Sequence, residues 1–146
     1  ATEALLKGLG SWEVDALILG GATFAGFNVV DVIRVNSEAG TPVIVFSGDR
    51  PDMDATRDAL RKHFPDWRER WSRYEKLGEI HILGISDYPL VYFEAVGCSK
   101  GFAVDVLREQ SVSCRTPECV RVADLIAKGV TPVFRGPAGC SGGSSG

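Results

Sequence analysis

Residues 14–46 read VDALILGGATFAGFNVVDVIRVNSEAGTPVIVF, and this stretch decides the fold class. Segments 14–19 and 41–46 are continuous apolar runs of strand length. Between them, residues 28–39 place their apolar side chains largely on one side of a helix, and Gly40 follows as the residue that a left-handed C-cap prefers. A strand, a helix and a strand with short connections predict a right-handed parallel unit whose strands are buried on both faces. The stretch therefore predicts an α/β fold with a mostly parallel sheet.

Further elements follow on both sides of this unit. Asp52 and Pro65 are typical of a helix start and a helix stop, and Asp66 with Glu69 resembles a capping box that opens the next helix. The same reasoning predicts helices over 3–9, 53–64, 66–76, 101–110 and 117–128, and two more strands over 80–84 and 90–96. We expect one domain over residues 1–135. The Gly- and Ser-rich residues 136–146 are expected to form a flexible tail.

Composition excludes several classes of protein. The chain has 146 residues, 45% of them hydrophobic and 24% charged, with a net charge of −3, so it is neither a disordered tail nor a globally basic protein. No apolar run approaches the length of about 20 residues that crosses a bilayer. We expect no membrane partner and a cytoplasmic location. The four cysteines, at 98, 114, 119 and 140, are expected to be free thiols, because a domain of this size is stable without disulfides and the cysteine spacing does not fit a zinc site.

A glycine-rich turn follows the first predicted strand. Ligands of an open parallel sheet bind beyond the carboxyl ends of its strands, and a turn that leads into a helix presents N–H groups to an anion, so a phosphate is expected there. The turn matches neither the dinucleotide-binding nor the P-loop pattern. The alternative is that the glycines only allow packing, that Asn28 caps the helix and that Asp31 interacts with its dipole. The candidate ligand-binding residues are Gly20, Gly21, Thr23, Asn28 and Asp31.

A cationic stretch interleaved with aromatic residues covers 57–76. It carries seven Arg and Lys against four Asp and Glu side chains, a local charge of +3 in an acidic chain. Cations beside aromatic faces are typical of a groove that binds a nucleic-acid backbone and stacks its bases. However, Trp67, Trp71 and Tyr74 have the spacing of one helix face, which favours inward packing over nucleic-acid contact. The candidate nucleic-acid contacts are Arg61, Arg68 and Arg121, although Arg121 could equally pair with Glu118.

Four segments together carry a family resemblance: VDALILGGATFAGFNVVDV at 14–32, GTPVIVF at 40–46, PDMDATRDALRKHFPDWRERW at 51–71 and RTPECVRVADLIA at 115–127. In order and spacing they resemble an uncharacterised, largely archaeal family, the domain-of-unknown-function family numbered ninety-nine, which is a relative of endonuclease V. The hexapeptide GFNVVD at 26–31 is the most specific element. The resemblance covers most of residues 1–128.

The resemblance implies a ribonuclease H-like, three-layer fold, in which acidic side chains hold Mg²⁺ for phosphodiester hydrolysis. Two departures weigh against catalysis. The aspartate at the end of the endonuclease V strand corresponds to Gly20, and a metal-site histidine falls near Cys98, whose thiol is a poor ligand for Mg²⁺. We therefore expect no bound metal and no cofactor, with Mg²⁺ needed only if the chain is active.

The resemblance also implies that an N-terminal strand region with an early aspartate, present in family members before a segment similar to ATEALLKGL, is absent here. Strand 14–19 would then be an open edge, which invites a homodimer. The resulting hypothesis is a catalytically impaired, nuclease-like protein that binds nucleic acid or a phosphate-bearing ligand. The alternatives are a non-catalytic protein-interaction module and an active Mg²⁺-dependent endonuclease.

Overall fold

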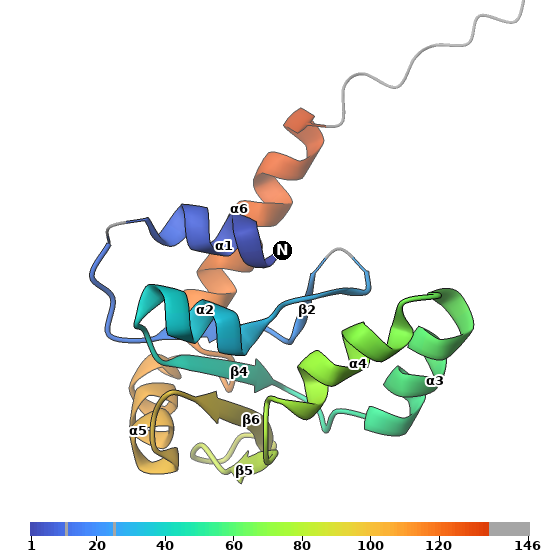
Figure 1. The fold of residues 1–146 in the computed structure, drawn as a ribbon. Coiled ribbons are helices and arrows are strands. Elements are labelled where there is room, and N and C mark those ends of the chain that lie inside the picture. The colour runs from blue at the N-terminus through green and yellow to red at the C-terminus, as the bar shows by residue number, and fades with distance from the viewer. Residues whose placement is uncertain (11, 25, 135–146) are drawn as a thin grey trace, which may run out of the picture.

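The computed structural model describes residues 1–10, 12–24 and 26–134 (Figure 1). Its helices are α1 (Thr2–Leu9), α2 (Val32–Ala39), α3 (Met53–His63), α4 (Trp67–Glu75), α5 (Lys100–Gln110) and α6 (Glu118–Phe134). Its strands are β1 (Leu17–Leu19), β2 (Thr23–Phe24), β3 (Asn28–Val29), β4 (Val43–Ser47), β5 (His81–Leu83) and β6 (Val91–Val96). The tail predicted for 136–146, and Cys140 within it, lie outside the described residues.

The main sheet has the strand order β1-β4-β6-β5. Strands β1 and β4 pair in parallel with Leu17 opposite Val43, which confirms the parallel unit predicted from residues 14–46. Strand β6 is antiparallel to both β4 and β5, so the sheet is mixed: β1, β4 and β5 share one direction and β6 runs against them. The short connection from β5 to β6 explains this reversal, because a parallel neighbour would need a long crossover.

Hydrophobic side chains are buried on both faces of the sheet. Val43 and Val45 of β4 join a cluster that includes side chains of α1 and α2, whereas Ile44 and Phe46 join a second cluster with α5. This alternation follows from the two-residue period of a strand. Helices α1 and α2 thus cover one face and α5 the other, which gives three layers (Figure 1).

One predicted helix start and one predicted helix cap differ from the structure. The helix predicted from 28 begins only at Val32, because Asn28 and Val29 pair with β2 in a small hairpin. Asp31, and not Asn28, caps α2 by accepting a hydrogen bond from the N–H of Arg34 at 3.1 Å. The capping box at Asp66 is also wrong. Its carboxylate accepts hydrogen bonds from the Arg70 guanidinium at 3.0 and 3.1 Å instead of capping a backbone N–H.

The β1 side of the sheet is open. In the described part of the chain, β1 pairs with β4 alone and forms one edge, as expected for this strand. Helix α6 starts beside β1, and its second half extends beyond the rest of the fold (Figure 1). Residues 121–130 of this helix are all exposed. None of the described helices combines the length and the hydropathy of a membrane span.

Candidate functional site

The carboxyl ends of β1 and β4 meet at the same edge of the sheet, where a ligand was expected. Gly20 follows β1, and a Cβ atom on it would lie 3.1 Å from a methyl carbon of Val120 in α6. Gly21 has a φ of 105° and open space around it. Gly20 therefore permits close packing of α6, and Gly21 permits the turn. The structure supports the packing role of these glycines and leaves phosphate binding untested.

The other three predicted ligand-binding residues have partners within the protein. Thr23 is hydrogen-bonded with Tyr74, Asn28 accepts a hydrogen bond from the amino group of Ala1 at 3.5 Å, and Asp31 caps α2. Thr23 and Asn28 lie on the two strands of the hairpin. The fold thus brings these residues to one region, but their polar groups support the hairpin and α2.

An arginine that the sequence analysis did not single out lies at the end of β4. The Arg115 guanidinium donates hydrogen bonds to the Gly48 carbonyl oxygen at 2.6 Å and to the Asp49 carboxylate at 3.3 Å. A Cβ atom on Gly48 would lie 3.4 Å from this guanidinium. Arg115 therefore holds the loop after β4, and no local sequence pattern marks it for that role.

The residues at the strand ends do not fit a resident Mg²⁺. Gly20 has no side-chain oxygen, Asp49 pairs with Arg115, and Asp31 is used as a helix cap. Burial raises the pKa of the Cys98 thiol, which favours its neutral form. In the portion of the chain that the structure describes, no three His, Cys, Asp or Glu side chains are grouped to hold a metal ion. Magnesium prefers carboxylate oxygens, and these do not converge here.

Glu94 is a second residue that the sequence analysis missed. It lies on β6 opposite Val45, is only 5% exposed, and has its pKa raised to about 7 by burial. Its position could have been noticed, because it is the one charged residue in the apolar run of β6. A carboxyl group with such a pKa can hold or release a proton near neutral pH.

The cationic helices place their aromatic rings against guanidinium groups. The Arg57, Arg68 and Arg70 guanidinium carbons lie 5.7, 5.1 and 4.4 Å from the ring centroids of Trp71, Trp67 and Phe64, respectively. Helix α4 has no buried residue. The predicted inward packing is thus wrong for Trp67 and Trp71, which are half-buried, whereas Tyr74 does pack against the core. The tryptophan spacing correctly placed both rings on one helix face. Guanidinium groups cover this face, and it is not buried in the core.

The arginines of α4 divide into two kinds. Arg70 and Arg73 donate hydrogen bonds to the carbonyl oxygens of Phe27 and Val29 at 2.8 and 3.0 Å, and so fasten α4 to the hairpin. Arg68 has no such contact. Among the residues with described side chains, the basic groups without an ion pair in this region are Arg61, Lys62, Arg68 and Lys76. Arg61 and Arg68 are therefore available as predicted nucleic-acid contacts.

Arg121 pairs with Glu118, as the alternative reading of this residue expected. Its Nε donates to a Glu118 oxygen at 2.9 Å, and the hydrogen bond lowers the pKa of the Glu118 carboxyl. Both side chains lie on the first turns of α6. The charge of Arg121 is thus locally balanced, which leaves Arg61 and Arg68 as the stronger candidates for contact with an anion.

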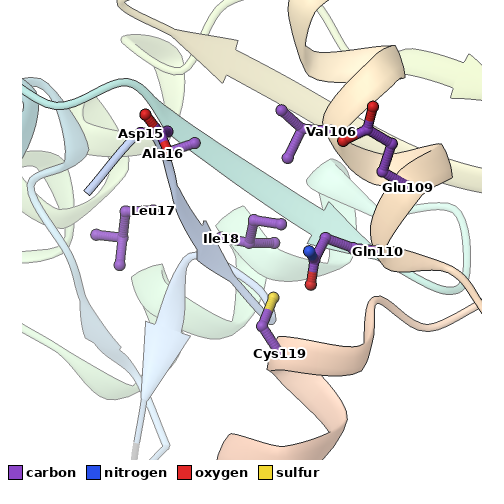
Figure 2. A pocket seen from close by; sticks show the side chains of 8 residues that line it. All are labelled: Asp15, Ala16, Leu17, Ile18, Val106, Glu109, Gln110 and Cys119. Carbon is purple, nitrogen blue, oxygen red and sulfur yellow. The ribbon is translucent and has the colours of Figure 1, made fainter.

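A groove lies along the open edge of β1 (Figure 2). Residues 15–18 line one side, the end of α5 lines another, and Cys119 points into it from the first turn of α6. The groove carries Asp15 and Glu109 at its margin. Cys119, together with the described Cys98 and Cys114, is a free thiol. Burial raises the pKa of Cys119, so it behaves as an apolar lining group.

The chain is similar to several archaeal proteins. A family profile described as "Endonuclease dU" matches residues 1–131. A UPF0215 protein of Pyrococcus furiosus is 38% identical over 133 residues, which cover 88% of this chain and 67% of the relative. A UPF0215 protein of Methanothermobacter thermautotrophicus is 38% identical over 119 residues, which cover 82% of this chain and 57% of the relative. The chain therefore spans only part of the length of these relatives.

The fold itself has a counterpart among solved structures. The crystal structure of a protein of unknown function from Archaeoglobus fulgidus superposes with a TM-score of 0.79 at 29% sequence identity. The match covers 89% of this chain and 74% of that protein. Since the match covers most of this chain, the two proteins share most of the arrangement described above.

Proposed function

Because the chain belongs to the endonuclease dU family, we propose that it is an endonuclease V-related protein of ribonuclease H-like fold that binds nucleic acid in the cytoplasm and, as this chain stands, does not cleave it. The observation that carries the binding proposal is the surface of α3 and α4, where guanidinium groups cover half-buried aromatic rings. Such surfaces combine phosphate attraction with ring stacking.

The charges on this surface favour a polyanion over a single phosphate. The basic groups that lack ion pairs come from both helices, with Arg61 and Lys62 on α3 and Arg68 on α4. The overall charge of the chain is −3, so the attraction must be local. A nucleic-acid backbone presents a row of phosphates that several separated cations can contact together.

The proposal that this chain does not cleave rests on the donor set. The carboxylates at the strand ends are used by Arg115 and by the cap of α2, and they do not converge on a common point. The alternative, an active Mg²⁺-dependent endonuclease, predicts cleavage of inosine-containing DNA or RNA in the presence of Mg²⁺ or Mn²⁺. We expect uncut substrate in a gel assay, and cut substrate would overturn this part of the proposal.

Retention on immobilised DNA at increasing salt concentration tests binding. We expect retention at low ionic strength that falls as salt rises, because each phosphate contact releases counterions. Arg61→Ala with Arg68→Ala should weaken retention and make its salt dependence shallower. Arg108→Ala is a matched control, since Arg108 is exposed on α5, which covers the opposite sheet face. No retention at low salt would overturn the binding proposal.

A second candidate function is protein interaction through the β1 side. The specific observation is that the open β1 edge, the groove beside it and the exposed α6 adjoin one another. Unpaired edges accept a further strand, so a second copy of the chain could pair there. Light scattering across a range of protein concentrations tests this: a dimeric mass supports the candidate and a constant monomeric mass contradicts it.

A further inference from the structure

We propose that Trp67 and Arg68 form a stacking platform for an unpaired nucleobase, so that the nucleic acid this protein prefers is single-stranded. This inference rests on the proposed nucleic-acid binding and specifies its substrate class. Both residues lie at the start of α4, and the Arg68 guanidinium lies 5.1 Å from the centroid of the Trp67 ring.

The three guanidinium–ring pairs of this region differ in how firmly they are held. Trp71 lies under the Arg57 guanidinium, and its ring centroid is 5.8 Å from that of Tyr74. Its indole N–H donates a hydrogen bond to Glu75 at 2.9 Å. These contacts fix its ring on several sides. Trp71 therefore contributes to the structure of the helix pair and has little surface to offer a ligand.

The pair of Phe64 and Arg70 is held in the same way. The ring centroids of Phe64 and Phe27 are 5.5 Å apart. The Arg70 guanidinium donates hydrogen bonds to both the Phe27 carbonyl oxygen and the Asp66 carboxylate. A base that displaced Arg70 would have to break these hydrogen bonds. This pair fastens the hairpin to α4 and is unsuited to reversible stacking.

Trp67 and Arg68 are different. Among the residues with described side chains, neither the Trp67 indole N–H nor the Arg68 guanidinium has a hydrogen-bond or ion-pair partner. Trp67 is half-buried and Arg68 is exposed. A guanidinium held only by an exposed cation–π contact is weakly fixed, and a nucleobase stacks on an indole at least as strongly. Arg68 can then contact a phosphate, or the outer face of the base.

The neighbouring charges fit a strand that runs past this ring. Arg57 of α3 lies over Trp71 of α4, so the two helices approach each other at that turn. Arg61 is one turn further along α3 and Trp67 one turn earlier along α4, which places both toward the connection between the helices. Arg61 and Lys62 are thus positioned to contact phosphates of a strand whose base stacks on Trp67. Bases of a duplex are already stacked and paired, and cannot reach the ring.

Affinity for a single-stranded oligonucleotide and for its duplex, measured at low salt by fluorescence anisotropy, tests the inference. We expect tighter binding of the single strand, a loss of about 10-fold in Trp67→Ala, and a smaller loss in Trp67→Phe, which keeps a stacking surface. Trp12→Ala is the matched control, because Trp12 is 77% exposed and lies outside this surface. Arg68→Ala, a change at an exposed position, keeps the test valid if Trp67→Ala fails to fold.

The outcomes separate the two proposals. If neither the single strand nor the duplex binds at low salt, nucleic-acid binding itself is overturned. If both bind but the duplex is preferred, or if Trp67→Ala and Arg68→Ala bind the single strand as tightly as the wild type, the stacking inference fails while nucleic-acid binding stands. Binding of the single strand should quench the tryptophan fluorescence of Trp12→Ala. Loss of this quenching in Trp12→Ala/Trp67→Phe would support stacking directly.

Discussion

Helices α4 and α6 are both amphipathic and both carry ion pairs along the helix, yet only α4 is tied to the fold along its length. Arg70 and Arg73 of α4 bind the hairpin, and Tyr74 packs against the core. In α6, residues 121–130 are all exposed, including apolar ones. An amphipathic pattern identifies the face that can be buried, but the presence of a layer to bury it depends on the rest of the chain.

The largest expected effect concerns the fastening of α4. In the double variant Arg70→Met/Arg73→Met, which keeps the side-chain stems, the free energy of unfolding should fall by about 3–6 kcal/mol, because two hydrogen bonds from charged donors to backbone carbonyls are lost. Urea denaturation measures this. Arg61→Met/Lys62→Met is the matched control on α3 and should stay within about 0.5 kcal/mol of wild type. Equal losses in both double variants would contradict the difference between the two kinds of arginine.

The second prediction concerns the carboxyl group on the sheet face next to α4. Val43, Val45 and Val96 belong to the core cluster against which Tyr74 of α4 packs, and Glu94 lies two residues before Val96 on β6, so Glu94 lies on the same sheet face. Burial raises its pKa to about 7 from the ordinary 4.5. Since the folded state holds the proton more tightly, stability from this group is full below pH 4.5 and is lost as the pH rises to 7.

Glu94→Gln isolates this effect, because glutamine mimics the protonated acid. Compared with wild type, the variant should be similar near pH 4 and more stable near pH 8, by about 2–3 kcal/mol. Thermal or urea unfolding across this pH range gives the difference, and other carboxyl groups cancel between the two proteins. A difference that does not vary with pH would show that the Glu94 pKa is ordinary.

Much of the fold could be predicted because the apolar runs are long. The runs at 14–19 and 41–46 and the intervening helix fix a parallel pair, and these features are local in sequence. The hairpin between β2 and β3 could not be predicted, because its strands have two residues each and it is held by Arg70 and Arg73, more than 40 residues away. A contact at that sequence distance leaves no local pattern.

The candidate site was harder to predict than the fold. Gly20 and Gly21 indicated a turn, but the close approach of Val120, whose methyl carbon would lie 3.1 Å from a Cβ atom on residue 20, depends on the position of α6. The sequence places Trp67 and Trp71 on the same face of a helix. Only the structure shows that the Trp71 indole N–H donates a hydrogen bond to Glu75, whereas the Trp67 indole N–H has no such partner among the residues with described side chains. The residue types indicated which chemistry the site could perform. Their hydrogen-bond and ion-pair partners, which only the structure shows, determine which of these residues can contact a ligand.

The smallest expected effect tests whether α6 is uncovered. Val122, Ile126 and Val130 continue the side of the helix on which Cys119 meets the groove, and they are 41, 61 and 44% exposed. If nothing covers them, Ile126→Ser should change the free energy of unfolding by less than about 0.5 kcal/mol.

Leu107→Ser, at a fully buried position of α5, should cost several times more than Ile126→Ser, because it removes core packing and buries a hydroxyl. Urea unfolding of both variants at low and high protein concentration measures the contrast. A loss above about 1 kcal/mol in Ile126→Ser would show that the α6 face is covered in solution. If that loss also grew with protein concentration, the cover would be a second copy of the chain, since only association makes stability depend on concentration. The contrast between α4 and α6 would then describe the isolated chain, with α6 tied down in the dimer as α4 is within one copy.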